Sequence, residues 1–363
     1  MKRPIHVLLV DDSPTVLAAF SAAFSASDEF VLLGAIDDSR KVLSAVTAQS
    51  PDVLVMDLDM PHLDGAEVTQ LIMEQCPTPI LIVTSIRQSA GDGHFRALAA
   101  GAVDILGKDR LVGIESNPYV QNLLYRKVRI VAGVTVFRRS RENQREKGVE
   151  PSSSTAPTLD PQIPESIGWR PRILAIGAST GGPPAIQALL ASFEDMIRVP
   201  VVIVQHMSEE FMPGFISWFA SNCRLPVVLA TEGLQFLSGT VYVAPGDRHL
   251  TVDGHLTAHT DSTVPINGCR PAIDRLFASL ADSIGRGVIG VLLTGMGRDG
   301  ALGLKTLHGT GAITIAQNEA TSAVYGMPGE AVRMAATSMV LPLEQIGPTI
   351  LELLDGRRGR GKT

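Results

Sequence analysis

The strongest constraint on this fold is a repeated alternation between short apolar runs and stretches whose apolar residues recur at helical spacing. Before about Leu124 there are five such runs, at residues 5–10, 30–36, 52–58, 79–85 and 102–106. The alternation returns at Arg172 and continues to about Leu354. Strands that alternate with helices form βαβ units and hence parallel sheets covered by helices. The sequence therefore predicts an α/β architecture on both sides of a central interruption.

The interruption is rich in charge, serine and proline, so residues 138–167 are expected to form an exposed linker. Five βα units predict the flavodoxin-like strand order 2-1-3-4-5 for the first region. The second region is expected to be a doubly wound, mostly parallel sheet, with antiparallel hairpins over residues 227–260. The sequence predicts a first domain at 1–125 and a second domain at 171–355. Between them, residues 126–170 are expected to form the end of the first domain and the linker, and residues 356–363 a flexible tail.

Bulk properties narrow the functional classes. A length of 363 residues suits two domains, and a net charge of −6 without basic excess argues against nucleic acid as a partner. The first apolar run breaks at Asp11 and Asp12, too early for a signal peptide or a membrane span. The three cysteines are widely spaced and form no CxxC pair, so they are expected to be reduced, half-buried residues of a cytoplasmic protein.

Polar residues follow the apolar runs of the first region. Asp11 and Asp12 follow the first run, Asp57 lies in the third, Thr84 ends the fourth and Lys108 follows the fifth. Clustered carboxylates favour a hard cation such as Mg²⁺, and with a lysine they suit phosphoryl transfer to an aspartate. The alternative is that the first two aspartates cap the next helix and that the lysine is a solvated charge.

Three residues of the second region, Ser179, His206 and Asp299, stand at or just past the ends of apolar runs. A hydroxyl, an imidazole and a carboxylate at one sheet edge are a nucleophile, its base and the group that orients the base, so they predict a hydrolase. The segment 177–181 also fits the G-x-S-x-G pattern. Alternatively, the serine is a helix N-cap, the histidine a core residue, and the aspartate a cap for a helix that begins near Gly300.

The segment Gly295-Met-Gly-Arg-Asp-Gly300, with Glu319 further on, fits the dinucleotide-binding fingerprint. It therefore leaves an NAD(P)-dependent oxidoreductase open as an alternative. Against that alternative, the fingerprint lies in the last third of the chain, and Asp299 would repel a pyrophosphate.

The first region resembles the receiver domain of two-component response regulators in the motifs VDDS, MDLDMPHLDG and VTS and in the position of Lys108. The resemblance implies that Asp57 is the phosphoacceptor and that Asp11 and Asp12 hold Mg²⁺ with it. It also implies that Thr84 and Lys108 sense the phosphate.

The second region resembles the chemotaxis protein-glutamate methylesterase (CheB) family in the motifs GASTGG, QHM, YVAPGDRH, RPAID, LLTGMGRDGA and TIAQNEATSAVYGMP. The resemblance implies an esterase, activated by phosphorylation, that hydrolyses glutamyl methyl esters on methyl-accepting chemoreceptors and deamidates receptor glutamines. Ser179 would be the nucleophile, His206 the base and Asp299 its orienter, with Thr180 and Met296 as candidates for the oxyanion hole.

The same resemblance implies a chemotaxis histidine kinase as phosphodonor and recruitment from the cytoplasm to receptor arrays. No cofactor is expected at the esterase site, and no membrane insertion is expected. Besides the oxidoreductase, a response regulator whose second domain only binds a partner remains an alternative.

Overall fold

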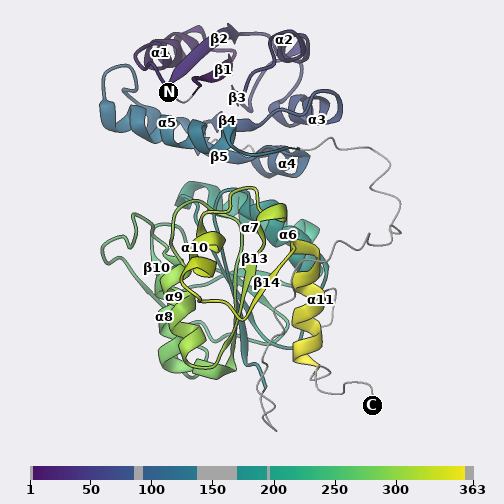
Figure 1. Ribbon diagram of the computed structural model, residues 1–363, viewed down its shortest axis with the longest axis vertical. Helices are drawn as coiled ribbons and strands as arrows, with labels where there is room; N and C mark the ends of the chain where they lie inside the picture. The colour runs from purple at the N-terminus through teal and green to yellow at the C-terminus, as the bar shows by residue number, and fades with distance from the viewer. Residues whose placement is uncertain (1–2, 86–92, 137–169, 194–196, 356–363) are drawn as a thin grey trace. The chain divides into compact units, whose positions relative to one another are not determined.

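The computed structural model describes residues 3–85, 93–136, 170–193 and 197–355, which form two compact units within 1–155 and 156–363 (Figure 1). The predicted linker over 138–167 and the predicted tail over 356–363 lie outside the described residues. The predicted domain boundaries therefore stay predictions, and each unit is considered by itself.

The first unit is built on a five-stranded parallel sheet in the order β2-β1-β3-β4-β5. In chain order the strands are β1 (Ile5–Val10), β2 (Phe30–Ile36), β3 (Val53–Met56), β4 (Ile80–Thr84) and β5 (Asp104–Gly107). This confirms the predicted flavodoxin-like order. Strands β3 and β4 are buried throughout, as expected for a parallel sheet covered on both faces.

Helices cover both faces of this sheet, with α1 and α5 on one side and α2, α3 and α4 on the other (Figure 1). Their bounds are α1 (Pro14–Ser25), α2 (Val42–Gln49), α3 (Gly65–Gln75), α4 (Gly93–Ala100) and α5 (Pro118–Ala132). Local sequence sets where they begin. Ser13 caps α1 ahead of Pro14, and Asp64 and Glu67 form a reciprocal capping box at the start of α3.

The second unit contains a seven-stranded parallel sheet in the order β14-β13-β12-β6-β7-β9-β8. Its strands are β6 (Ile173–Ala178), β7 (Val201–Gln205), β8 (Val227–Leu229), β9 (Val241–Val243), β12 (Val288–Leu292), β13 (Ile313–Gln317) and β14 (Met339–Leu341). The central strands β12, β6 and β7 are fully buried, so the polar residues that follow them end up together at one protected edge.

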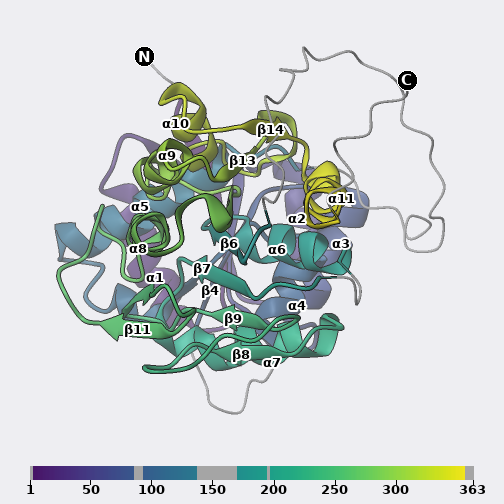
Figure 2. The same ribbon diagram turned by 90° about the horizontal axis from the view of Figure 1, so that it is seen from below.

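Two helical layers sandwich this sheet. One layer contains α8, α9 and α10, and the other contains α6, α7 and α11 (Figures 1 and 2). The bounds are α6 (Gly182–Ala191), α7 (Met212–Asn222), α8 (Ile273–Ser283), α9 (Ala301–Gly309), α10 (Met327–Arg333) and α11 (Leu343–Leu354). The arrangement confirms the predicted doubly wound, mostly parallel fold. None of the helices in the described ranges is long and apolar enough to cross a bilayer.

The prediction for residues 227–260 was only partly right. Strands β10 (His249–Val252) and β11 (Ala258–Asp261) do form an antiparallel hairpin around the Asp253–Gly254 turn. Strands β8 and β9, however, pair in parallel and extend the main sheet. The chain between them passes beside the hairpin, where Gln235 bridges Thr257, and so re-enters the sheet in its original direction.

Candidate active site

The second unit contains a histidine–aspartate pair at the carboxyl edge of its sheet. His206 directly follows β7, and its Nε2 lies 2.8 Å from Oδ2 of Asp299, which is 2% exposed. Asp299 comes from the loop between β12 and α9, so residues 93 positions apart meet here. Because Nε2 faces the carboxylate, Nδ1 is the nitrogen left to accept a proton from a nucleophile.

Ser179 lies at the same edge, in the turn between β6 and α6. Ala178 and Gln205 are register partners in β6 and β7, and the His206 N–H donates to the Ala178 carbonyl. The serine and the histidine therefore follow paired residues of adjacent strands. The N-cap of α6 is Gly181, with φ of 74°, so the alternative of Ser179 as helix cap is wrong. No hydrogen bond joins its hydroxyl to His206 among the described contacts, and such bonds are often long or absent in ligand-free enzymes.

The hydrogen-bond donors that hold Asp299 come from other segments of the chain. Its carboxylate accepts from the Ile273 N–H at 2.7 Å and the Asp274 N–H at 3.3 Å, at the first turn of α8. The Asn267 amide donates to the same carboxylate at 3.3 Å and to Asp274 at 2.8 Å. The alternative that Asp299 caps the helix after Gly300 is wrong, because α9 has no side-chain cap.

These contacts set the charge states. Burial would raise the pKa of Asp299, but its bonds to His206, to the Ile273 amide and to Asn267 hold it below the ordinary value. Burial likewise disfavours the imidazolium, yet bonds to Asp299 and to the Cys269 thiol raise the pKa of His206 to about 9. A carboxylate that stays ionised beside a basic imidazole is the combination that stabilises the imidazolium formed during acyl transfer.

The residues predicted for the oxyanion hole flank Ser179. Thr180 is 3% exposed, and its carbonyl accepts from Thr294 Oγ1 at 2.9 Å. Among the described contacts, no hydrogen bond engages the N–H of Met296, whose neighbour Gly295 packs against Ser179 so closely that a Cβ on it would lie 2.8 Å from the serine Cβ. This glycine therefore allows the loop that bears Met296 to approach Ser179.

Sequence reasoning missed several residues that shape this edge. Gln205 is 3% exposed, and its Nε2 donates to the carbonyls of Ser179 at 2.9 Å and His206 at 3.1 Å. It thereby ties together the two turns that carry Ser179 and His206. A glutamine that closes an apolar strand could have signalled this role, whereas no motif or spacing pointed to Asn267 or Cys269.

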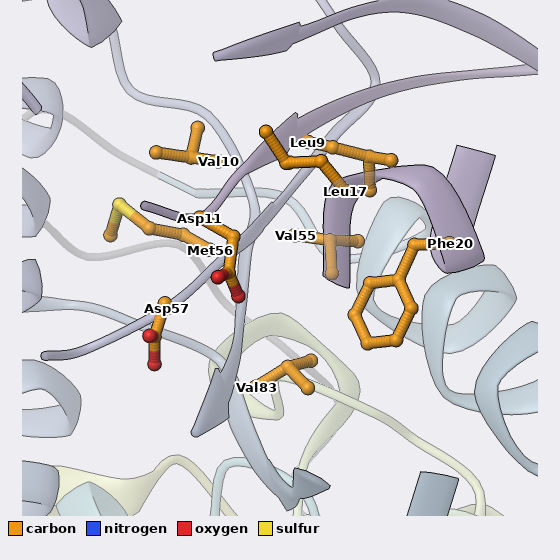
Figure 3. A pocket seen from close by; sticks show the side chains of 9 residues that line it. All are labelled: Leu9, Val10, Asp11, Leu17, Phe20, Val55, Met56, Asp57 and Val83. Carbon is orange, nitrogen blue, oxygen red and sulfur yellow. The ribbon is translucent and has the colours of Figure 1, made fainter. Parts of the chain in front are cut away.

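The first unit brings its predicted residues together as well. Lys108 Nζ lies 2.6 Å from Asp11 Oδ2 and 2.8 Å from Asp57 Oδ2. Both aspartates, labelled in Figure 3, are at most 5% exposed. Thr84 ends β4 opposite Gly107, the residue before the lysine. Helix α1 is capped by Ser13, so the helix-cap alternative for the aspartates is wrong. The solvated-charge alternative for Lys108 is wrong too, because it makes two ion pairs.

The same cluster has the donors of a magnesium site. Oxygens of Asp11, Asp12 and Asp57 all lie within 4.8 Å of one another, and Asp12 is exposed. Burial raises the pKa of Asp11 against the opposing effect of Lys108, and the two carboxylates raise the pKa of Lys108 although burial opposes this. A hard divalent cation would relieve the repulsion between these carboxylates, so the residues present fit Mg²⁺.

Comparison with known proteins matches a family model to each of the two units. Residues 174–350 match the family model described as CheB methylesterase, and residues 7–112 match that of the response regulator receiver domain. The chain is 38% identical to the protein-glutamate methylesterase/protein-glutamine glutaminase 1 of Syntrophus aciditrophicus, over 96% of this chain and 98% of that protein. The chain belongs to the protein-glutamate methylesterase/protein-glutamine glutaminase family.

Two further proteins are similar to this chain. The protein-glutamate methylesterase/protein-glutamine glutaminase of Nitrosospira multiformis is 38% identical over 99% of both chains. The crystal structure of the Thermotoga maritima CheB methylesterase catalytic domain is 33% identical and covers 50% of this chain and 98% of its own, with a TM-score of 0.49.

Two of the three glycines of the dinucleotide-like fingerprint, Gly295 and Gly300, have a packing role in this methylesterase/glutaminase family member. A Cβ on Gly300, whose φ is +86°, would lie 2.6 Å from Leu292 and 2.7 Å from Ile273, and Gly295 allows the approach of Ser179. Asp299, between them, bonds to His206. The fingerprint therefore serves close packing at the hydrolase edge, and the oxidoreductase alternative has no support.

Proposed function

We propose that Ser179, His206 and Asp299 carry out the hydrolysis of glutamyl methyl esters and the deamidation of glutamines on methyl-accepting chemoreceptors. The observation that carries this proposal is the 2.8 Å contact between His206 and the buried Asp299, at the sheet edge where Ser179 follows β6. The names of the relatives support the choice of ester and amide as substrates.

In this mechanism His206 Nδ1 takes the proton of Ser179 as Oγ attacks the side-chain carbonyl of the substrate. The N–H groups of Met296 and Thr180 stabilise the oxyanion. The imidazolium then gives its proton to the leaving methoxide, which departs as methanol, or to the amide nitrogen of glutamine, which departs as ammonia. Water repeats the sequence on the acyl-enzyme and frees a glutamate carboxylate. Asp299 keeps the proton on Nε2, so that Nδ1 faces the nucleophile.

For the first unit, the proposal is that Asp57 accepts a phosphoryl group from a chemotaxis histidine kinase and that its phosphorylation activates the esterase. Asp11, Asp12 and Asp57 would hold Mg²⁺, which neutralises charge on the transferring phosphoryl oxygens when bound. Lys108 already contacts two of these carboxylates and would bind the phosphoryl group, with Thr84 at its side. A cytoplasmic protein recruited to receptor arrays fits this assignment.

The test is methanol release from methylated receptor, with and without a small-molecule phosphodonor. Ser179→Ala is expected to abolish release, whereas the matched surface variant Ser221→Ala keeps it. Asp57→Asn is expected to keep basal release and lose stimulation by the phosphodonor, and Asp28→Asn serves as its control. Full activity of Ser179→Ala would contradict the assigned nucleophile, and stimulation of Asp57→Asn would contradict the assigned phosphoacceptor.

A further inference from the structure

A cysteine thiol lies against the base of the proposed active site. Sγ of Cys269 is 3.7 Å from Nδ1 of His206, on the opposite side of the ring from Asp299. Asp299, His206 and Cys269 thus offer one ligand atom each, all within 4.8 Å of one another. None of the mechanistic steps above uses the thiol.

The position of the thiol is fixed by a tight turn. Ile266 and Cys269 exchange backbone hydrogen bonds at 3.1 and 2.8 Å around Asn267 and Gly268, whose φ angles are 52° and 76°. An Asn-Gly pair with both φ angles positive is the sequence favoured by a two-residue hairpin turn. The next residue, Arg270, bonds to Asp247 at 2.7 Å, which fastens the turn to the body of the unit.

The separation of the two atoms matches that of two ligands on one zinc ion. With Zn–S near 2.3 Å, Zn–N near 2.0–2.1 Å and tetrahedral angles, the sulfur and nitrogen lie about 3.6 Å apart. The observed separation is 3.7 Å. Metal-bound histidines usually donate their other ring N–H to a carboxylate, and Asp299 already accepts from Nε2 at 2.8 Å. Thiolate and imidazole are ligands that select zinc rather than magnesium.

We infer that Cys269 Sγ and His206 Nδ1 form a site for an inhibitory zinc ion, with Asp299 as the outer carboxylate; the inhibition rests on the proposed function. Binding displaces the thiol proton and the Nδ1 proton to solvent, and the ion then occupies the Nδ1 lone pair that must accept the Ser179 proton. The bound enzyme therefore lacks its base. Two protein ligands leave coordination positions for water, so the ion exchanges with solvent, unlike a structural ion held by four protein ligands.

The first arm of the test is spectroscopic and requires no activity. Co²⁺ is added to the full-length protein without phosphodonor, and the thiolate-to-cobalt charge-transfer absorbance is recorded. The band is expected in the wild type, and it should disappear on addition of Zn²⁺. It is also expected in Cys223→Ser, the control variant, because Cys223 is another half-buried cysteine of the same unit. It should be absent in Cys269→Ser and in His206→Ala. The carboxylates of the first unit can bind Co²⁺, but they cannot give a thiolate band.

The second arm measures methyl ester hydrolysis during Zn²⁺ titration, each variant relative to its own metal-free rate. Wild type and Cys223→Ser should be inhibited together and recover with a chelator, whereas Cys269→Ser should require on the order of tenfold more Zn²⁺ or higher. A wild type without the band, a band that persists in Cys269→Ser or His206→Ala, or equal inhibition of wild type and Cys269→Ser would overturn the zinc site. If the esterase function itself were wrong, the band would still report on the site.

Discussion

The pKa of His206, raised to about 9, predicts an enzyme whose activity increases well into the alkaline range. A general base must be neutral to accept a proton, and at pH 7 a group with this pKa is neutral in only about 1% of molecules. Between pH 7 and 8 the rate should therefore rise roughly tenfold, and it should level off only above about pH 9. An imidazole with its ordinary pKa, near 6.5, would already have reached its plateau at pH 7.5.

The contacts of His206 also predict which variants should shift the pH profile of activity. Asp299→Asn removes the charge that favours the imidazolium, so the midpoint should shift toward acid while the plateau falls on the order of 10⁴-fold, as in other triads. Cys269→Ser removes the second group that raises the pKa, so it should also shift the midpoint toward acid. Cys223 makes no contact with the ring in the described structure, so Cys223→Ser should leave the midpoint unchanged.

The assay is kcat/KM for methanol release from methylated receptor between pH 6 and 10, because this parameter reports the ionisation of the free enzyme. Ser179→Ala supplies the blank for uncatalysed ester hydrolysis at alkaline pH. Metal chelator in the buffer prevents zinc from mimicking a proton on Nδ1. A profile that is flat above pH 7, or one whose midpoint stays in place in Asp299→Asn, would refute the assignment of His206 as the titrating base.

Two further substitutions test the framework around the sites. Gly182→Ala would place a Cβ 2.0 Å from Gln205 Oε1. Because Gln205 ties together the turns that carry Ser179 and His206, activity should fall on the order of 10²-fold. Gly309→Ala, with open space around its Cβ, should change activity little, and equal activities of the two variants would contradict this account. Tyr125→Phe removes the hydroxyl that donates to the Ala23 carbonyl of α1, which keeps a backbone donor from Ala26. The free energy of unfolding of the first unit, from urea denaturation, should therefore fall by about 0.5–1.5 kcal/mol. Tyr119→Phe, at an 83% exposed position, is the control, and no difference between the two variants would contradict the prediction.

The architecture was predictable because it depends on regular, local signals. Each strand of the first unit coincides with an apolar run, and a parallel strand order places the residues after β1, β3 and β5 at one edge. The wrong prediction of antiparallel pairing for β8 and β9 has a different cause. Short strands separated by glycine and aspartate fit either a hairpin or a parallel extension, and the outcome depends on where the intervening loop packs.

The candidate active-site residues could be predicted from the sequence only where they follow the ends of strands. Asp299 illustrates the limit: its place after an apolar run suggested a carboxylate at the edge, but its charge depends on the amides of Ile273 and Asp274 from another helix. Cys269 lies in a hairpin turn 63 residues from His206, and nothing in its spacing predicts the contact. A motif identifies which groups can react. The pKa at which they react, and what can block them, depends on neighbours that only the fold brings into contact. Those neighbours are therefore the residues whose substitution should move the pH profile without removing the nucleophile.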